Sequence, residues 1–114
     1  MILLPGAKSH SQLTAKVHAR PHGGMSRVVV ALCDSELLGK IYTQGERVLD
    51  LKNYRGFYEG AAVTEIEAIE LLRMADNANI VGEKSVAIAK KAFGVSSTET
   101  KTIKKIPHLQ YYKI

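Results

Sequence analysis

A glycine between an aliphatic segment and an amphipathic helix is the feature that most constrains this chain. Residues 79–94 read NIVGEKSVAIAKKAFG, so Gly82 precedes the predicted helix and Gly94 follows it. Apolar residues recur near helical spacing from Val81 to Phe93, which predicts a helix with one face on a hydrophobic core. Gly94 is typical of the position at which a helix ends.

The start of this helix also has the chemistry of an anion site. The first turn of a helix has unpaired N–H groups at the positive end of its dipole, and Gly82 would let a ligand approach the backbone closely. Basic residues follow at Lys84, Lys90 and Lys91. The segment therefore fits either a turn that contacts phosphate or a surface helix that only packs on the core.

The stretch from Gly82 to Gly94 is similar to the second half of a helix-hairpin-helix motif, which grips nucleic-acid backbone through its hairpin amides. Ile80 stands where that motif has its first hairpin glycine, and the segment from Leu71 to Gly82 is longer than its hairpin. The resemblance covers one half of the motif and implies contact with a phosphate backbone.

The net charge of +5 is distributed unevenly along the 114 residues. Residues 1–24 contain three basic residues and no acidic one, whereas residues 25–114 contain 13 basic and 11 acidic ones. A basic, acid-free segment suits contact with a polyanion, because binding displaces condensed counterions. We expect residues 1–24 to form a flexible basic extension and residues 25–114 to form one domain. A linker, an added sequence and an upstream start are alternatives for the extension.

Cysteine content and hydropathy favour a cytoplasmic protein with no membrane partner. The single cysteine, Cys33, excludes an internal disulfide framework and a cysteine-rich zinc site. No apolar run approaches the ~18 residues that span a bilayer. No pair of candidate ligands has the helical spacing of a metal site, so we predict neither a metal nor another cofactor. The oligomeric state is left open.

The remaining local patterns predict an α+β fold. We expect a buried strand over residues 28–33, a short strand or turn over 36–41, a half-exposed strand over 47–52 that pairs with the first, and two short strands around Pro107. Thr64 and Glu67 form a capping-box pattern at the start of a helix. Its predicted inner face contains Ile66, Ile69 and Leu72, with Leu71 and Ala75 as further candidates. The order of elements fits a small mixed or antiparallel sheet with two helices packed on one face.

Aromatic residues gather between Asn53 and Gly60. Tyr54, Phe57 and Tyr58 stand close together with Arg55 among them. Bases stack on aromatic faces, and an arginine nearby can hold a phosphate. Aromatic residues in a glycine-flanked loop also cap the edge of a core, and the sequence leaves both interpretations open.

Four separated segments resemble the archaeal family known as domain of unknown function 424. They are CDSELLGK at 33–40, FYEG at 57–60, ANIVGEKSV at 78–86 and PHLQ at 107–110. The likeness spans residues 25–114. It implies an archaeal cytoplasmic protein of about this size and no particular activity.

We predict a non-catalytic protein that binds RNA or a ribonucleoprotein and is associated with the ribosome and translation. The predicted contacts are Gly82, Lys84, Lys90, Lys91, Lys104, Lys105, Arg55 and Tyr58. One alternative is a small enzyme in which His108 activates Cys33. Another is a module that offers a protein partner its acidic helix face or its aromatic loop. No catalytic residue is assigned.

Overall fold

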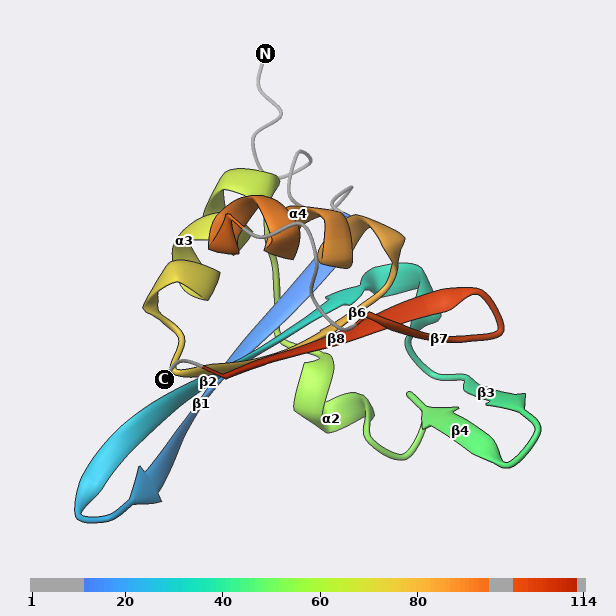
Figure 1. Cartoon of the computed structure of the whole chain (residues 1–114), viewed down its shortest axis with the longest axis horizontal. Coiled ribbons are helices and arrows are strands. Elements are labelled where there is room, and N and C mark those ends of the chain that lie inside the picture. Colours follow the sequence, from blue (N-terminus) through green and yellow to red (C-terminus); the bar gives the residue numbers. More distant parts are fainter. Residues whose placement is uncertain (1–11, 95–99, 113–114) are drawn as a thin grey trace.

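The structure, a computed structural model, describes residues 12–94 and 100–112. In this part of the chain a six-stranded mixed sheet has the order β5-β1-β2-β6-β8-β7, and β3 and β4 form a separate two-stranded sheet (Figure 1). The strands are β1 Leu13–His22, β2 Met25–Asp34, β3 Ile41–Gln44, β4 Arg47–Asp50, β5 Ala61–Ala62, β6 Asn77–Val81, β7 Lys101–Ile103 and β8 Ile106–Tyr112. The helices are η1 Ser35–Leu37, α2 Arg55–Tyr58, α3 Glu65–Met74 and α4 Glu83–Phe93.

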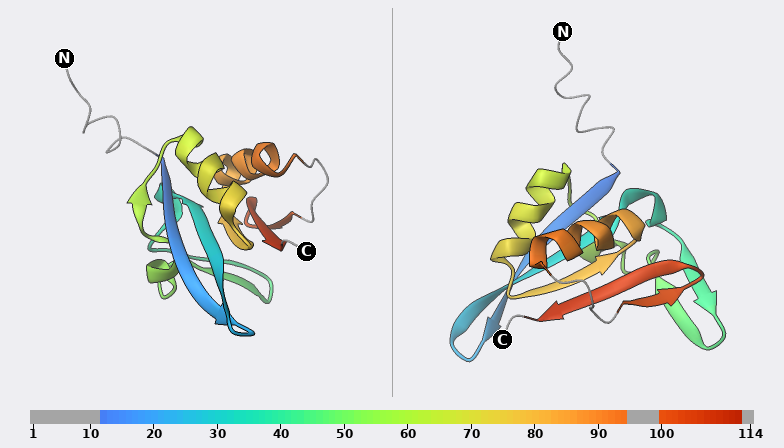
Figure 2. Two further views of the ribbon diagram at one scale, coloured as in Figure 1. Left: turned by 90° about the vertical axis from the view of Figure 1, so that its left-hand side faces the viewer. Right: turned by 45° about the horizontal axis from the view of Figure 1, so that its top comes forward.

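The two faces of the large sheet are covered differently. Helices α3 and α4 lie together on one face, and α2 and the β3–β4 hairpin lie on the other (Figures 1 and 2). The predicted α+β architecture, with a mixed sheet and two helices on one face, is confirmed. No described helix is long and apolar enough to cross a membrane.

The centre of the sheet is its one parallel pair, β2 with β6, within the described residues. Both strands are aliphatic and bury residues on both faces, as parallel strands do when each face is covered. Residues on one face pack beneath the helices around Val30, Leu32 and Ile80. Residues on the other face, among them Cys33 and Val81, pack against the β3–β4 hairpin and α2.

Helix α3 begins as the sequence predicts. The Thr64 hydroxyl accepts a hydrogen bond from the Glu67 amide, and the Glu67 carboxylate accepts one from the Thr64 amide. Its predicted inner face is partly wrong, because Ile66 is 72% exposed. The residues that reach the core, Ala68, Leu72 and Ala75, follow the i, i+4, i+7 spacing, and Ile66 lies off that stripe.

The expected boundary at residue 24 does not hold for residues 13–22. These residues form β1, which pairs with β2 along its whole length and buries Leu13 and Ala15. Gly23 and Gly24 both have positive φ, at 60° and 82°, as a two-residue hairpin turn requires. The pair of glycines is thus a turn within the domain. The prediction for residues 1–11 lies outside the described residues.

The predicted pairing of residues 47–52 is also wrong. Strand β4 pairs with β3 and not with β2. The reason is that both edges of β2 are already occupied, by β1 and by β6. Near the C-terminus, the two strands predicted around Pro107 are β7 and β8. Lys104 and Lys105 form the turn between them, and Pro107 is the second residue of β8.

Candidate functional site

The start of α4 is already occupied by a side chain of the protein itself. The buried Asp34 carboxylate, 4% exposed, accepts hydrogen bonds from the amides of Lys84 at 3.1 Å and Ser85 at 2.9 Å. It also accepts one from the Ser85 hydroxyl at 2.7 Å. These donors are the ones that a bound phosphate would need. Asp34, at the end of β2, therefore acts as an internal anion that fastens α4 to the sheet.

Gly82 serves this internal contact. Its φ is 111°, and a Cβ at this position would overlap the Asp34 carboxyl group. The close approach expected here therefore takes place, but toward Asp34. The segment before Gly82 is strand β6 in the middle of the sheet, so the likeness to a helix-hairpin-helix is not supported by the fold: Ile80 and Val81 are core residues of a strand.

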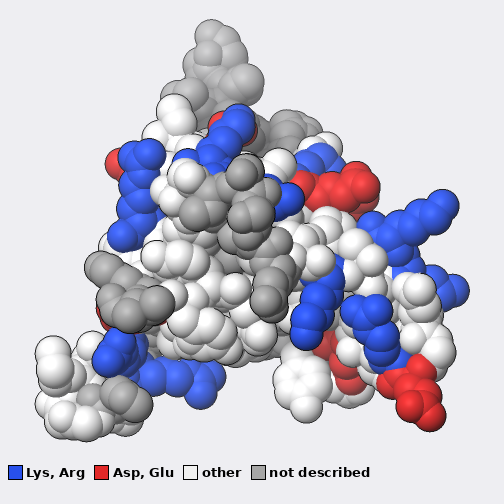
Figure 3. Space-filling view, viewed as in Figure 1, with Lys and Arg blue, Asp and Glu red and all other residues white. Residues whose placement is uncertain are grey.

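The predicted basic contacts are dispersed. Three have carboxylate partners: Lys84 with Glu36 at 3.0 Å, Lys91 with Glu65 at 3.0 Å, and Arg55 with Glu59 at 2.9 and 3.0 Å. The hydrogen bond to Glu36 raises the pKa of Lys84. Lys90 is partly buried in the last turn of α4, and Lys104 and Lys105 lie at the β7–β8 turn. Basic side chains accordingly lie at several separate places on the face shown in Figure 3.

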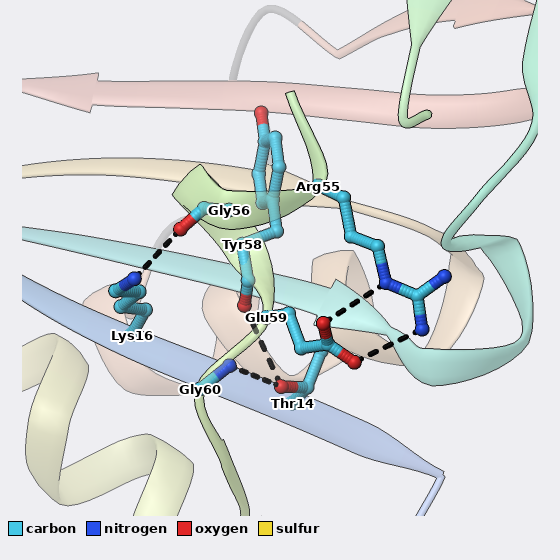
Figure 4. Close-up of polar contacts among 7 residues, drawn as sticks. All are labelled: Thr14, Lys16, Arg55, Gly56, Tyr58, Glu59 and Gly60. Atoms are coloured by element: carbon cyan, nitrogen blue, oxygen red, sulfur yellow. Dashed lines mark hydrogen bonds and ion pairs between the residues drawn. The ribbon is translucent and has the colours of Figure 1, made fainter. Parts of the chain in front are cut away.

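Tyr58 is a core residue, because it is only 8% exposed and packs beneath the sheet. Burial and the neighbouring Cys33 raise the pKa of its phenol to about 12. Helix α2 is attached to β1 by hydrogen bonds from Lys16 Nζ to the Gly56 carbonyl at 2.8 Å and from the Gly60 amide to Thr14 Oγ1 at 2.9 Å (Figure 4). For Tyr58 the core-capping interpretation of the aromatic loop is correct.

Cys33 and His108 lie on the same face of the sheet, but they are not cross-strand neighbours. Cys33 is opposite Val81, and Val81 is opposite His108, so a strand separates them. Burial and the adjacent Asp34 raise the pKa of the Cys33 thiol to about 12. Burial and Lys101 lower the pKa of His108. A buried thiol of raised pKa is protonated and unreactive at neutral pH, so this geometry gives no support to a thiolate nucleophile.

The structure also reveals a surface that the sequence interpretation missed. The hairpin and α2 cover one end of the second sheet face, where Ala31 is buried among their side chains. Three rows of cross-strand neighbours lie at the border of this cover and beyond it. They are Lys16–Ala31–Asn79–Gln110, His18–Val29–Asn77–Tyr112 and Arg20–Arg27. We call this surface the open sheet face. It extends toward the tip of the β1–β2 hairpin, which projects away from the β3–β4 hairpin (Figure 1).

Aromatic and basic groups meet at the side of the open sheet face. The His18 ring stacks on Phe57 of α2, with 4.6 Å between ring centroids and 10° between planes. His18 Nε2 also donates a hydrogen bond to the Phe57 carbonyl at 2.9 Å. The Arg20 guanidinium lies 5.9 Å from the centroid of the same ring, within the range of a cation–π contact.

Two hollows lie along this face. The first, about 520 Å³, is bounded by α2, β4 and β6, and we call it the aromatic groove; its lining includes Tyr54, Phe57 and Asn79. The second, about 350 Å³, lies toward the hairpin tip, and we call it the arginine pocket; its lining includes Arg20, Arg27, Asp76, Asn77 and Tyr112. Asn77 and Asn79 are two residues apart on β6, about 7 Å. The two hollows are therefore neighbours.

A signal for this surface is present in the sequence. Residues 13–20 alternate apolar and polar residues as LTAKVHAR, which is the period-2 pattern of a strand with one polar face. A flexible extension over residues 1–24 does not account for that alternation. A strand does, and it places Lys16, His18 and Arg20 on one face.

Comparisons with known proteins agree with this fold. The crystal structure of an uncharacterized conserved protein from Methanopyrus kandleri is similar, with a TM-score of 0.69 and 25% sequence identity over 88% of this chain and 91% of that chain. A comparison with curated proteins found no match. The family described as Protein of unknown function (DUF424) matches residues 24–114. The structural similarity covers a larger share of the chain than that segment, so it includes residues before residue 24. The chain belongs to the DUF424 family.

Proposed function

We propose that this protein binds single-stranded RNA, free or within a ribonucleoprotein, and that it does so without catalysis. The observation that carries the proposal is the open sheet face, where guanidinium groups, an aromatic edge and side-chain amides lie side by side. Exposed strands with aromatic and basic side chains suit single strands, because unpaired bases can stack while their phosphates meet cations.

The arrangement of charge supports an anionic ligand. The three rows of the open sheet face contain Lys16, Arg20 and Arg27 and no acidic residue. Arg20 and Arg27 are directly opposite each other on β1 and β2. Like charges in that position destabilise a sheet, and an anion between them relieves the repulsion. Asp76, at the border of the arginine pocket, has its Oδ2 atom engaged by the Val28 amide at 2.8 Å.

The proposed contacts therefore differ from those expected at the start of α4. The amides there hold Asp34, and Lys84, Lys91 and Arg55 have carboxylate partners. Lys90, Lys104 and Lys105 add attraction at longer range, which assists encounter with a polyanion. From the basic charge and the archaeal structural neighbour, we infer that the bound RNA belongs to the translation machinery and that the protein acts in the cytoplasm.

The test compares two matched double variants. Arg20→Ala/Arg27→Ala removes the opposed arginines, and Arg47→Ala/Arg73→Ala removes two exposed arginines from β4 and α3. Binding of a short single-stranded RNA is measured over a series of salt concentrations. We expect the first variant to bind more weakly and to lower the slope of log affinity against log salt by ~1.4, from two lost phosphate contacts. The second variant should keep the wild-type slope.

Equal losses in both variants, or a wild-type affinity that does not depend on salt, would contradict the proposal. Isolation of the wild-type protein with its native partners tests the cellular context. Ribosomal subunits recovered with the wild type and lost with Arg20→Ala/Arg27→Ala would support the placement in translation. Recovery of a protein partner without RNA, retained by that variant, would favour the interaction-module alternative.

A further inference from the structure

The aromatic groove has walls suited to a flat, uncharged ring. Tyr54 is 65% exposed at its rim, and Phe57 lies on the same side. Val48, 57% exposed, and Leu49 line it from the β3–β4 hairpin. A volume of about 520 Å³ is within the size range of small-molecule sites. Aromatic and aliphatic side chains of α2 and β4 thus form much of the wall of the groove, and Asn79 of β6 is part of its lining.

Asn79, which lines the groove from β6, belongs to a pair of amides. Gln110 of β8 donates a hydrogen bond from Nε2 to Asn79 Oδ1 at 3.0 Å. The two side chains come from directly opposed residues of adjacent strands, so each holds the other in place. Among the described residues, Asn79 Nδ2 and Gln110 Oε1 make no further hydrogen bond. The pair therefore presents N–H donors on Asn79 and an acceptor on Gln110, which are the kinds of group that the edge of a base can meet.

An acidic residue in the lining of the aromatic groove favours an uncharged base over a phosphate as its ligand. Asp50 accepts hydrogen bonds from the Lys52 and Asn53 amides and from Asn53 Nδ2, and the bond with the Asn53 side chain lowers the pKa of its carboxyl. Asp50 is consequently anionic at neutral pH and repels a phosphate. The arginine pocket, about 7 Å farther along β6, attracts one.

We propose that the aromatic groove binds one nucleobase, which stacks on Tyr54 and is hydrogen-bonded by the Asn79–Gln110 pair, while a phosphate of the same strand lies toward Arg20 and Arg27. This assignment rests on the proposed RNA binding and adds the part of the ligand that each hollow takes. It gives the protein a means of preferring RNA with an unpaired base over duplex RNA, in which every base is stacked.

The experiment uses the full chain and three probes: a short single-stranded RNA, the same backbone with abasic sites, and adenosine monophosphate. Tyr54→Ala removes the exposed ring, and Ile66→Ala on the outer side of α3 is the control for loss of an exposed apolar side chain. Stacking of one base corresponds to a 5- to 150-fold change in affinity. We expect Tyr54→Ala to lose that factor with RNA but not with the abasic strand, and Ile66→Ala to bind both as wild type does.

A second variant, Gln110→Ala, leaves the ring in place and removes half of the amide pair. It should reduce the differences in affinity among the four homopolymeric RNAs. If wild type and Tyr54→Ala bind RNA and the abasic strand equally, the groove assignment is overturned while RNA binding survives. Binding of adenosine monophosphate as tightly as RNA, with the same loss in Tyr54→Ala, would show that the base belongs to a free nucleotide. Absence of binding to all three probes would overturn both proposals.

Discussion

The two faces of the large sheet differ in how far their polar groups are hydrogen-bonded within the protein. Beneath the helices, the Asp34 carboxylate, the α4 amides and the Ser85 hydroxyl satisfy one another, and Thr64 and Glu67 close the start of α3. On the other face, Asn77 Oδ1 is buried without a hydrogen-bond partner among the described residues. There also Arg20 is opposite Arg27. At the start of α4, beneath the glycine motif, the polar groups thus have their hydrogen-bond partners within the protein. The other face is where a ligand would add contacts.

A helix start preceded by glycine is therefore not by itself a ligand site. The same amides that attract a phosphate also attract a carboxylate of the chain, and a carboxylate held by the fold competes at no cost of association. In this protein Asp34 at the end of β2 fills that role. The glycine motif and the proposed ligand site consequently lie on opposite faces of one sheet.

The largest expected effect comes from Gly82→Val. A branched side chain would adopt an unfavourable φ near 111° and overlap the Asp34 carboxyl group, which is buried. Strain of ~1–3 kcal/mol and overpacking of ~1–3 kcal/mol together predict a loss of about 2–6 kcal/mol in the free energy of unfolding. Urea denaturation measures it. Gly56→Ala in α2, where a Cβ meets nothing within 4 Å, is the control and should change stability little. A fully stable Gly82→Val would contradict the close packing of Gly82 against Asp34.

The next effect comes from the internal anion. Asp34→Ala removes the acceptor of two amides and one hydroxyl at the start of α4. Loss of a cap costs ~1–2 kcal/mol and unsatisfied buried donors add to it, so we expect about 2–3 kcal/mol less stability. Ser85→Ala, which removes only the hydroxyl, should cost less. Thermal and urea unfolding of the two variants would separate the contribution of the carboxylate from that of the hydroxyl, and an unchanged midpoint in Asp34→Ala would refute the capping role.

An effect that is absent at neutral pH and confined to alkaline pH concerns the covered end of the second face. Burial raises the pKa of the Cys33 thiol from 9.0 to about 12 in the folded protein. Above pH 9 the unfolded chain therefore loses this proton while the native state keeps it, and stability falls as pH rises from about 9 to 12. The slope from this group is at most ~1.4 kcal/mol per pH unit. Unfolding of Cys33→Ala should show a shallower decline, and an identical decline would contradict the burial of a protonated thiol.

Local patterns predicted the elements whose structure depends on neighbours in sequence. The capping box at Thr64, the α4 helix between Gly82 and Gly94, and the buried strand that contains Cys33 all appear where expected. What could not be predicted depends on competition between distant segments. Strand β4 does not pair with β2, because β1 and β6 occupy both edges of β2.

The candidate site shows the same division. The sequence identified aromatic residues at 54–58 and basic residues in pairs, yet it could not show that Tyr58 points into the core while Tyr54 is exposed. It also could not show that Lys84 and Lys91 have acidic partners far away in the chain. Side-chain direction in a four-residue helix depends on which face the sheet covers, and that is settled only when the layers pack.

The amino-acid sequence alone was enough to indicate the family, the α+β class, the start of α3 and both ends of α4, because caps, periodicity and glycine turns act within a few residues. The tertiary structure decided which anion the α4 amides hold, since Asp34 is 48 residues before Gly82 and reaches it only across the parallel β2–β6 pair. The tertiary structure also decided which polar rows form the open sheet face beside the β3–β4 hairpin and α2. Cross-strand rows join β1, β2, β6 and β8, and the register of those strands exists only in the folded sheet.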